Sequence, residues 1–383
     1  MLKPLIKWPG GKSSEIDRFA SLIPDYDRYI EPFVGGGAVY FYLKPERAVI
    51  NDISEDLMEF YRLVKAQDEQ FRQILELYCR SFTGLKQICE QRYEDILELY
   101  SIYEDALKNG RNVKDLQLHL GLVSQIVCDP LVMTELVLDR EDFLDQMLRM
   151  TEDKFLRTIQ NNQKKPFSSK DLKDNLVTGF TSGFYMYFRG VFNEIAAGRL
   201  VAAKQYRIAN FYFIREYCYG SMFRYNQKGE FNIPYGGISY NSKDLEGKVA
   251  HMFGDGVKKL LSRTEIHCQD FEAFLRELEL TDRDFLFLDP PYDTDFSDYE
   301  GKEFGREDQK RLADFLRTTR AKFLLVIKNT EYIYGLYQDS GFRILTFDNR
   351  YLYNMRSRND RSAEHLLITN VPEEEIPWKR ENF

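Results

Sequence analysis

Residues 285–292 read Phe-Leu-Phe-Leu-Asp-Pro-Pro-Tyr, and this stretch decides the fold. Its apolar half, residues 285–288, is typical of a strand in a parallel sheet, because both faces of such a sheet are covered and polar alternation disappears. Ligands of open α/β sheets bind beyond the carboxyl ends of the strands. Residues 289–292 are therefore expected where chemistry is done, although Asp, Pro and Tyr also suit an ordinary strand-ending turn.

The tetrapeptide supplies the groups needed to hold a planar base that bears an exocyclic amine. Asp289 provides a carboxylate acceptor. Pro290 and Pro291 form a stiff turn that has backbone carbonyls but no N–H, and Tyr292 adds an aromatic face. We predict that these four residues are catalytic.

Three segments nearer the N-terminus have the pattern of a nucleotide-binding half-sheet. Residues 6–12 read Ile-Lys-Trp-Pro-Gly-Gly-Lys. Residues 29–37, Tyr-Ile-Glu-Pro-Phe-Val-Gly-Gly-Gly, indicate a strand that runs into a glycine-rich turn, where the backbone can approach a ligand closely. Residues 48–52, Ala-Val-Ile-Asn-Asp, indicate a second strand that ends in an acid. An acid one strand after such a turn is the usual geometry for binding a ribose diol.

Two other phosphate-binding motifs can be compared with the glycines of these segments. A nicotinamide dinucleotide enzyme requires Gly-x-Gly-x-x-Gly, which residues 35–40, Gly-Gly-Gly-Ala-Val-Tyr, do not spell. A P-loop requires a glycine where Ile6 stands, so the sequence Gly-Lys-Ser at 11–13 also fails. The pattern favours an adenosine with a small zwitterionic tail over a dinucleotide.

The composition is that of a folded chain with no metal or disulfide framework. Its 383 residues are ample for one large or two medium domains, and its five cysteines form no C-x-x-C pair. We therefore expect no metal site, no membrane segment and a reducing cytoplasm.

The net charge of −8 is unevenly distributed along the chain. Residues 199–263 hold eleven Lys or Arg against five Asp or Glu, a balance of +6, whereas residues 66–160 hold eleven against eighteen, or −7. A local basic field matters more for DNA binding than the total charge, so the acidic total does not exclude nucleic acid.

The order of these motifs resembles that of DNA adenine-N6 methyltransferases of the Dam type (D12 class, alpha group). Lys-Trp-x-Gly-Gly-Lys, Glu-Pro-Phe-x-Gly-x-Gly, Asn-Asp-Ile and Asp-Pro-Pro-Tyr occur in the order of that family. Residues 223–236 resemble its DNA-reading segment, and Phe296, Ser297, Tyr299 and Phe304 resemble its aromatic lid. The resemblance covers nearly the whole chain except about 66–200, where apolar spacing indicates helices and 161–166 indicates a loop.

The resemblance implies an α/β fold with a doubly wound, mostly parallel Rossmann-like methyltransferase sheet. Residues 1–65 and 264–383 would form a discontinuous catalytic domain that depends on S-adenosylmethionine. Residues 66–263 would form an inserted, mainly helical target recognition domain with a hairpin near 223–236.

The resemblance also implies the binding residues. Those for S-adenosylmethionine, whose product is S-adenosylhomocysteine, are Trp8, Gly10, Gly11, Lys12, Glu31, Phe33, Gly35, Gly37, Asp52, Ile53, Asp270, Phe271 and Asp289. Those for double-stranded DNA are Arg224, Tyr225, Asn226 and Lys228.

The expected reaction is methylation of N6 of an adenine that has flipped out of the duplex. Asp289 and the Pro290 carbonyl would accept the amine hydrogens, and the base would stack on Tyr292. Methylation of cytosine N4, RNA or protein glutamine, and a non-catalytic DNA-binding regulator on the same fold, stay open as alternatives.

The partners are less defined by the sequence. Residues 219–221, Tyr-Gly-Ser, depart from the Asn-Gly pair usual in compact Dam enzymes, so the target sequence is open and GATC is only a guess. A restriction endonuclease acting independently is a possible partner, and no oligomer is implied.

Overall fold

The computed structural model describes residues 2–110, 117–222, 224–291, 298–299, 302–350 and 362–375. It divides into two compact units, neither of which is continuous in sequence. The first unit comprises Met1–Gln67, Met222–Gly229 and Met252–Phe383. The second comprises Asp68–Ser221 and Glu230–His251.

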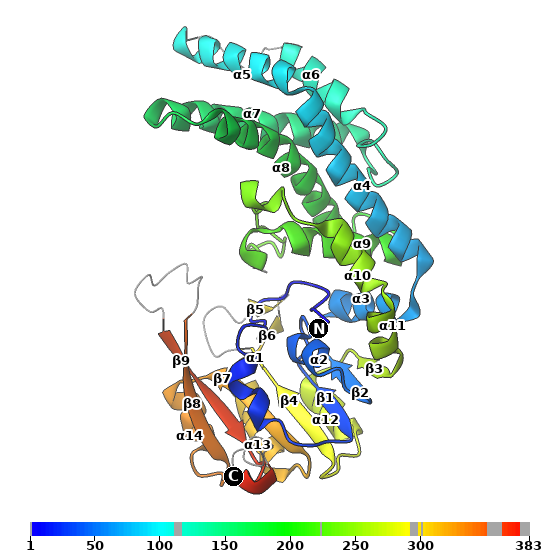
Figure 1. Ribbon diagram of the computed structural model, residues 1–383, viewed down its shortest axis with the longest axis vertical. Helices are drawn as coiled ribbons and strands as arrows, with labels where there is room; N and C mark the ends of the chain where they lie inside the picture. The colour runs from blue at the N-terminus through cyan, green and yellow to red at the C-terminus, as the bar shows by residue number, and fades with distance from the viewer. Residues whose placement is uncertain are drawn as a thin grey trace. The chain divides into compact units, whose positions relative to one another are not determined.

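A mixed seven-stranded sheet forms the centre of the first unit (Figure 1). Its strands are β1 (Arg28–Glu31), β2 (Ala48–Asn51), β3 (Thr264–His267), β4 (Asp284–Leu288), β7 (Lys322–Lys328), β8 (Arg343–Arg350) and β9 (Ser362–Thr369). Their spatial order is β3-β2-β1-β4-β7-β9-β8. The first five are parallel, whereas β9 runs antiparallel to β7 and to β8. The predicted α/β fold with a mostly parallel sheet is confirmed.

Strand β4 lies inside the parallel part of the sheet, as its apolar sequence predicts. Leu286 is in register with Ile30 of β1 on one side and with Phe323 of β7 on the other. All five residues of β4 are buried. The continuous apolar run is therefore explained by cover on both faces of the sheet.

Helices cover both of these faces. The helices of the first unit are α1 (Ile16–Phe19), α2 (Ala38–Leu43), α3 (Glu55–Ala66), α11 (Asp255–Ser262), α12 (Phe271–Glu277), α13 (Arg306–Thr318) and α14 (Glu331–Tyr337). Side chains of α12, α13 and α14 share one buried cluster with Leu286 and Leu288. On the opposite face, Phe19 of α1 stacks on Phe287 with ring centroids 5.6 Å apart.

The second unit is mainly helical. Its longer helices are α4 (Glu69–Gln91), α5 (Tyr93–Lys108), α6 (Gln117–Val127), α7 (Arg140–Lys164), α8 (Ser169–Ala196), α9 (Lys204–Tyr217) and α10 (Leu245–Met252), the last ending just beyond it. The helical character predicted for residues 66–200 is confirmed. The predicted loop at 161–166 is wrong in part, because α7 continues to Lys164 and the polar side chains there lie on a helix.

Helices α7 and α8 approach each other closely at two glycines of α8. A Cβ atom on Gly179 would lie 3.2 Å from the Cα atom of Thr151, and one on Gly183 would lie 3.0 Å from the Cα atom of Met147. The two glycines are four residues apart and so lie on one face of α8. Glycine at both positions permits this backbone approach. Over the residues that the structure describes, no helix is both long enough and apolar enough to span a bilayer.

Candidate active site

The carboxyl ends of four neighbouring strands bring four acidic side chains to one edge of the sheet. Asp270 follows β3, Asp52 follows β2, Glu31 ends β1 and Asp289 follows β4. These strands are parallel, so their ends meet at the same edge. The chain passes from β1 to β2 on one side, while β4 lies on the other, and a crevice for ligands opens at such a switch point.

A pocket lies at this switch point, within the first unit. It is lined by Trp8, Pro9, Gly10, Gly11, Lys12, Glu31, Phe33, Val34, Gly35, Gly36, Gly37, Ala38, Val39, Asp52, Phe287, Asp289, Pro290 and Pro291. A second pocket shares Phe33 and Asp52 with the first. It is lined by Pro32, Phe33, Asn51, Asp52, Ile53, Gln269, Asp270, Phe271, Phe304 and Asp308. The structure thus brings every predicted cofactor-binding residue into one of two pockets that share a wall.

Lys12 and Asp289 form an ion pair inside the first pocket. The Lys12 Nζ atom lies 2.8 Å from Oδ1 of Asp289 and donates a hydrogen bond to the Gly10 carbonyl at 3.1 Å. Lys12 is 2% exposed and the Asp289 side chain is 18% exposed. Burial raises the pKa of Asp289 above its usual value, and the neighbouring Lys12 partly opposes that rise. The motifs gave no sign of this contact, because the two residues are far apart in sequence.

Glu31 lies buried beside this pair. The Tyr29 hydroxyl donates a hydrogen bond to its Oε2 atom at 2.8 Å. Burial raises the pKa of Glu31 well above its usual value, and the nearby carboxylates of Asp289 and Asp52 raise it further. A cationic group in the pocket would favour the ionised form of these acids. Within the described ranges, no group of three or more His, Cys, Asp or Glu residues could hold a metal ion.

The glycine-rich turn after β1 holds Asp52 and packs against Trp8. Gly35 has a positive φ of 47°, and a Cβ atom there would lie 2.6 Å from Cδ1 of the Trp8 indole. The Gly35 N–H donates to Oδ2 of Asp52 at 3.0 Å, and the Ser54 N–H donates to Oδ1 at 3.0 Å. Two backbone donors therefore orient this carboxylate toward the shared wall of the pockets.

Three aromatic rings meet in the second pocket. The Phe33 ring centroid lies 5.4 Å from that of Phe271 and 5.5 Å from that of Phe304, and the last two are 5.5 Å apart. Asp270 stands at the edge of this cluster as the N-cap of α12, where it accepts the N–H groups of Glu272 and Ala273. Apolar rings beside one oriented carboxylate suit a flat base with an amine on its edge.

Two positioning residues were not predicted from the sequence. Asn51 Nδ2 donates to the carbonyls of Pro32 and Gln269 at 3.1 Å each, and its Oδ1 accepts the Gln269 N–H at 2.9 Å. Gln309 of α13 is fully buried and donates from Nε2 to the Pro291 carbonyl at 2.9 Å. Asn51 stood next to the predicted Asp52, which was a usable signal, whereas nothing local marked Gln309.

The residues predicted to contact DNA do not line either pocket. Arg224 and Lys228 are exposed, and Tyr225 is half-buried. Asn226 closes a turn: its Oδ1 accepts the Lys228 N–H at 2.9 Å and its carbonyl accepts the Gly229 N–H at 2.9 Å. The predicted hairpin tip is therefore a turn, and its side-chain amide has a structural use.

Some predicted residues cannot be placed. Tyr292, Phe223, Phe296 and Ser297 lie outside the described residues. Of the four residues predicted to be catalytic, the structure therefore locates Asp289, Pro290 and Pro291.

The sequence is similar to known DNA methyltransferases over most of its length. A family model described as D12 class N6 adenine-specific DNA methyltransferase matches residues 8–175 and 98–352. The type II methyltransferase M.CviBI of Paramecium bursaria Chlorella virus NC1A is 25% identical over 376 residues, which cover 96% of this chain and 100% of the relative. The type II methyltransferase M.MjaIII of Methanocaldococcus jannaschii is 27% identical, with 96% and 99% covered. A DNA adenine methylase of Vibrio cholerae is 20% identical, with 97% and 96% covered.

Proposed function

The chain belongs to the D12 class N6 adenine-specific DNA methyltransferase family and methylates N6 of adenine in DNA; we propose that its methyl donor is S-adenosylmethionine and that it acts on a flipped-out adenine in double-stranded DNA. One observation carries this proposal. Asp289, Pro290 and Pro291 follow β4 directly and line the pocket at the switch point of the sheet. The acceptor groups for an amine and the donor pocket thus share one crevice.

The two pockets suit the two ends of S-adenosylmethionine. When bound, this donor supplies an electrophilic methyl group on a sulfonium. The aromatic cluster of Phe33, Phe271 and Phe304 fits its adenine ring, with Asp270 at the amine edge. Asp52, in the shared wall, fits the ribose hydroxyls. With the donor bound at the carboxyl ends of its parallel strands, the first unit would have a Rossmann-like methyltransferase fold.

The methionine end of the donor belongs in the first pocket. Its cationic amino group offsets the mutual repulsion of Glu31, Asp52 and Asp289, whose proximity raises the pKa of Glu31. The residues proposed to surround it are Trp8, Gly10, Gly11, Lys12, Glu31, Gly35, Gly37 and Asp289.

The chain's contribution to chemistry is to orient the target amine. The N6 lone pair is delocalised into the adenine ring and is a poor nucleophile. Hydrogen bonds from both amine hydrogens, to Asp289 and to the Pro290 carbonyl, draw the nitrogen toward tetrahedral geometry and free that lone pair. Positioning is then the main catalytic device, and Asp289 serves as an orienting acceptor.

The target base must leave the duplex to reach these acceptors. Unstacking costs a few kcal/mol, and stacking on Tyr292 returns about 1–3 kcal/mol. We propose that residues 66–263 recognise the target, with Arg224, Tyr225 and Lys228 supplying contacts to bases or phosphates. We further propose a role in a restriction-modification or epigenetic system; the two relatives named type II methyltransferases fit the first of these.

A modified-base genome map tests the proposal. The chain is expressed in a host that lacks adenine methylation, and the genome is sequenced with detection of modified bases. N6-methyladenine confined to one motif, and lost with Asp289→Ala, is the expected result. An unmodified genome from folded protein that binds S-adenosylhomocysteine would move the substrate to RNA or another molecule, and failure to bind it would overturn the proposed donor.

A further inference from the structure

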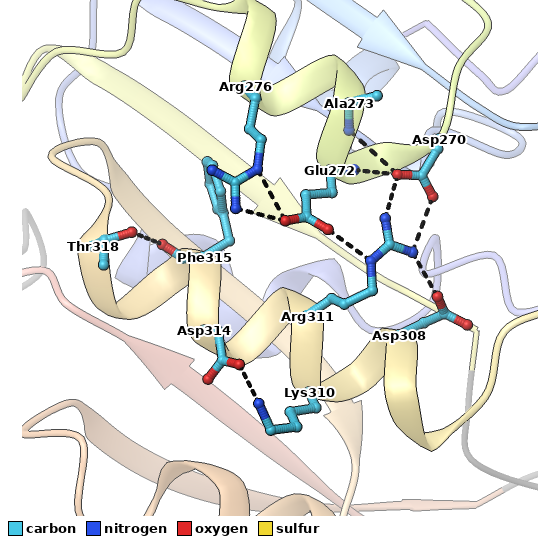
Figure 2. A network of polar contacts seen from close by, with 10 residues as sticks. All are labelled: Asp270, Glu272, Ala273, Arg276, Asp308, Lys310, Arg311, Asp314, Phe315 and Thr318. Atoms are coloured by element: carbon cyan, nitrogen blue, oxygen red, sulfur yellow. Dashed lines mark hydrogen bonds and ion pairs between the residues drawn. The ribbon is translucent and has the colours of Figure 1, made fainter.

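Arg311 of α13 is the centre of a polar network at the second pocket (Figure 2). Its guanidinium makes three ion pairs: Nη2 lies 2.6 Å from Oδ1 of Asp270, Nε lies 2.6 Å from Oε2 of Glu272, and Nη1 lies 2.7 Å from Oδ1 of Asp308. One cation thus joins three carboxylates at the starts of two helices: Asp270 is the N-cap of α12, Glu272 lies in its first turn, and Asp308 lies in the first turn of α13.

The network borders the proposed adenine site. Asp270 and Asp308 both line the second pocket, as does Phe271. The Arg311 guanidinium carbon lies 4.9 Å from the centroid of the Phe271 ring, a cation–π contact. Arg311 itself does not line the pocket, so it acts on a ligand through the groups that do.

The hydrogen bonds of Asp270 show how Arg311 orients this carboxylate. Oδ1 accepts the N–H groups of Glu272 at 3.1 Å and Ala273 at 3.3 Å, and it also accepts Nη2 of Arg311. Oδ2 receives a longer bond of 3.3 Å from Nη1 of Arg311. A carboxylate offers about four lone-pair positions. Oδ2 therefore keeps capacity for a further donor, such as an amine hydrogen.

The charge balance of the network also favours an ionised Asp270. Burial acts to raise the pKa of Asp270, but the hydrogen bond from Arg311 and the backbone bonds outweigh it, so the pKa is lowered. Asp270, Glu272 and Asp308 would repel one another without a cation between them. Exposed ion pairs usually add little to the free energy of folding. The planar guanidinium of Arg311, however, binds three carboxylates at once and so also fixes their orientation.

We propose that Arg311 is a positioning residue for the adenine of the cofactor. It turns the Asp270 carboxylate so that Oδ2 accepts the exocyclic amine, and it lies against the Phe271 ring beside the adenine pocket. This inference rests on the proposed function, because it requires that the second pocket take the adenine of S-adenosylmethionine. Arg311 would therefore determine which base of the cofactor is bound, and it would take no part in methyl transfer.

The test compares two ligands that differ at the amine edge. Calorimetry measures the Kd of S-adenosylhomocysteine and of S-inosylhomocysteine, which carries a carbonyl in place of the amine. Wild-type protein is expected to prefer the adenosyl compound by about tenfold or more, the worth of a hydrogen bond to a charged acceptor. Arg311→Gln is expected to raise the Kd of S-adenosylhomocysteine by about tenfold and to change the Kd of S-inosylhomocysteine little. The ratio of the two Kd values should then approach one.

Arg317→Gln is the matched control. Arg317 lies on the same helix and pairs with Asp314, away from both pockets, and its substitution removes the same charge. It should keep the wild-type preference. If Arg311→Gln raises the Kd of both ligands by the same factor, or changes neither Kd, the proposal is overturned.

Two further outcomes separate this inference from the proposed function. Should Arg311→Gln fail to fold, Arg311→Lys carries the test, since it keeps the charge but loses the fork; an unchanged preference would then refute the proposal. Wild-type protein that binds neither ligand would overturn the proposed donor itself. Wild-type protein that binds both equally would leave the donor standing and remove the role assigned to Asp270 and Arg311.

Discussion

The Lys12 ammonium lies 2.8 Å from Oδ1 of Asp289, so the N-terminal segment and the end of β4 meet in the first pocket. Lys12 is almost wholly buried, so truncating Asp289 would remove its partner at 2.8 Å, and truncating Lys12 would remove the cation that opposes the rise in the pKa of Asp289. In the proposed mechanism, the pair would link the pocket for the donor to the acceptor of the target amine.

Asp289→Asn should abolish most methyl transfer while the fold remains and the donor, whose proposed pocket Asp289 also lines, still binds. The amide keeps one acceptor oxygen but loses the negative charge that draws out the amine hydrogen. We expect kcat to fall by about 10²–10³, the range for loss of one preorganised hydrogen-bonding group. Transfer of radioactive methyl groups to DNA measures the rate, and calorimetry with S-adenosylhomocysteine checks the pocket. A near-wild-type kcat would remove Asp289 from the mechanism.

Lys12→Met should move the acid limb of the pH–rate profile to higher pH. The active form of Asp289 is the carboxylate; burial raises its pKa, and Lys12 opposes that rise. Loss of Lys12 therefore raises the pKa further, and activity disappears at a higher pH as the solution is acidified. The profile of kcat/KM reports the shift in the free enzyme. Lys12→Arg retains the charge and should keep the limb near its wild-type position.

Gln309→Ala should lower kcat with little effect on the KM for the donor. The substitution removes the N–H that holds the Pro291 carbonyl and leaves that acceptor unsatisfied, a cost of about 1–3 kcal/mol. Loosening the turn misplaces the two amine acceptors, for which we expect a loss of about tenfold or more in kcat. Lys310→Ala, at the exposed neighbouring position, is the control. Equal kinetics for the two variants would count against a role for Gln309.

Gly35→Ala should weaken both folding and donor binding. The new Cβ atom would lie 2.6 Å from the Trp8 ring, and the positive φ at this position is strained for alanine. We expect a loss of about 1–3 kcal/mol in the free energy of unfolding, measured by urea denaturation. Gly335→Ala in α14 is the contrasting variant, because nothing lies within 4 Å of its Cβ position and alanine favours a helix. The idea fails if the two variants behave alike.

His119 should make the second unit less stable in acid. Its Nε2 lies 2.8 Å from Oγ1 of Thr151, a hydroxyl that already donates to the Met147 carbonyl, so Nε2 carries the proton. Nδ1 then accepts the Tyr103 hydroxyl at 2.9 Å, and the ring is neutral. Burial lowers the pKa of His119 from 6.5 to about 4.

The sign of the effect follows from that depressed pKa. The unfolded chain binds a proton below pH 6.5 and the folded chain does so only near pH 4, so stability present above 6.5 is lost between these values. The loss is about 3 kcal/mol. His119→Gln removes this proton, and urea denaturation at pH 7 and pH 4.5 should show a shallower dependence than wild type. An unchanged dependence would mean that His119 titrates normally.

The residues proposed to bind the donor and the target amine were predictable because their signals are local. A buried parallel strand appears in the sequence as an apolar run. In the turn after β1, Gly35 has a positive φ and Trp8 packs against it, so a glycine marks this position in the sequence. Strands β1, β2 and β4 and the acids at their ends were therefore found from the chain. The end of α7 was not predicted correctly, because the polar residues 161–164 suit a loop and a solvent-exposed helix equally.

By itself, the sequence determined strands β1, β2 and β4, the turn after β4 and the types of group proposed to hold a base and a donor, since each depends on neighbouring residues. Only the tertiary structure decided which groups meet. The order β3-β2-β1-β4 aligns Asp270, Asp52, Glu31 and Asp289 at one edge. Helix α13 then brings Gln309 to Pro291 and Arg311 to Asp270. These contacts join distant segments through packing on the sheet, which no local pattern records.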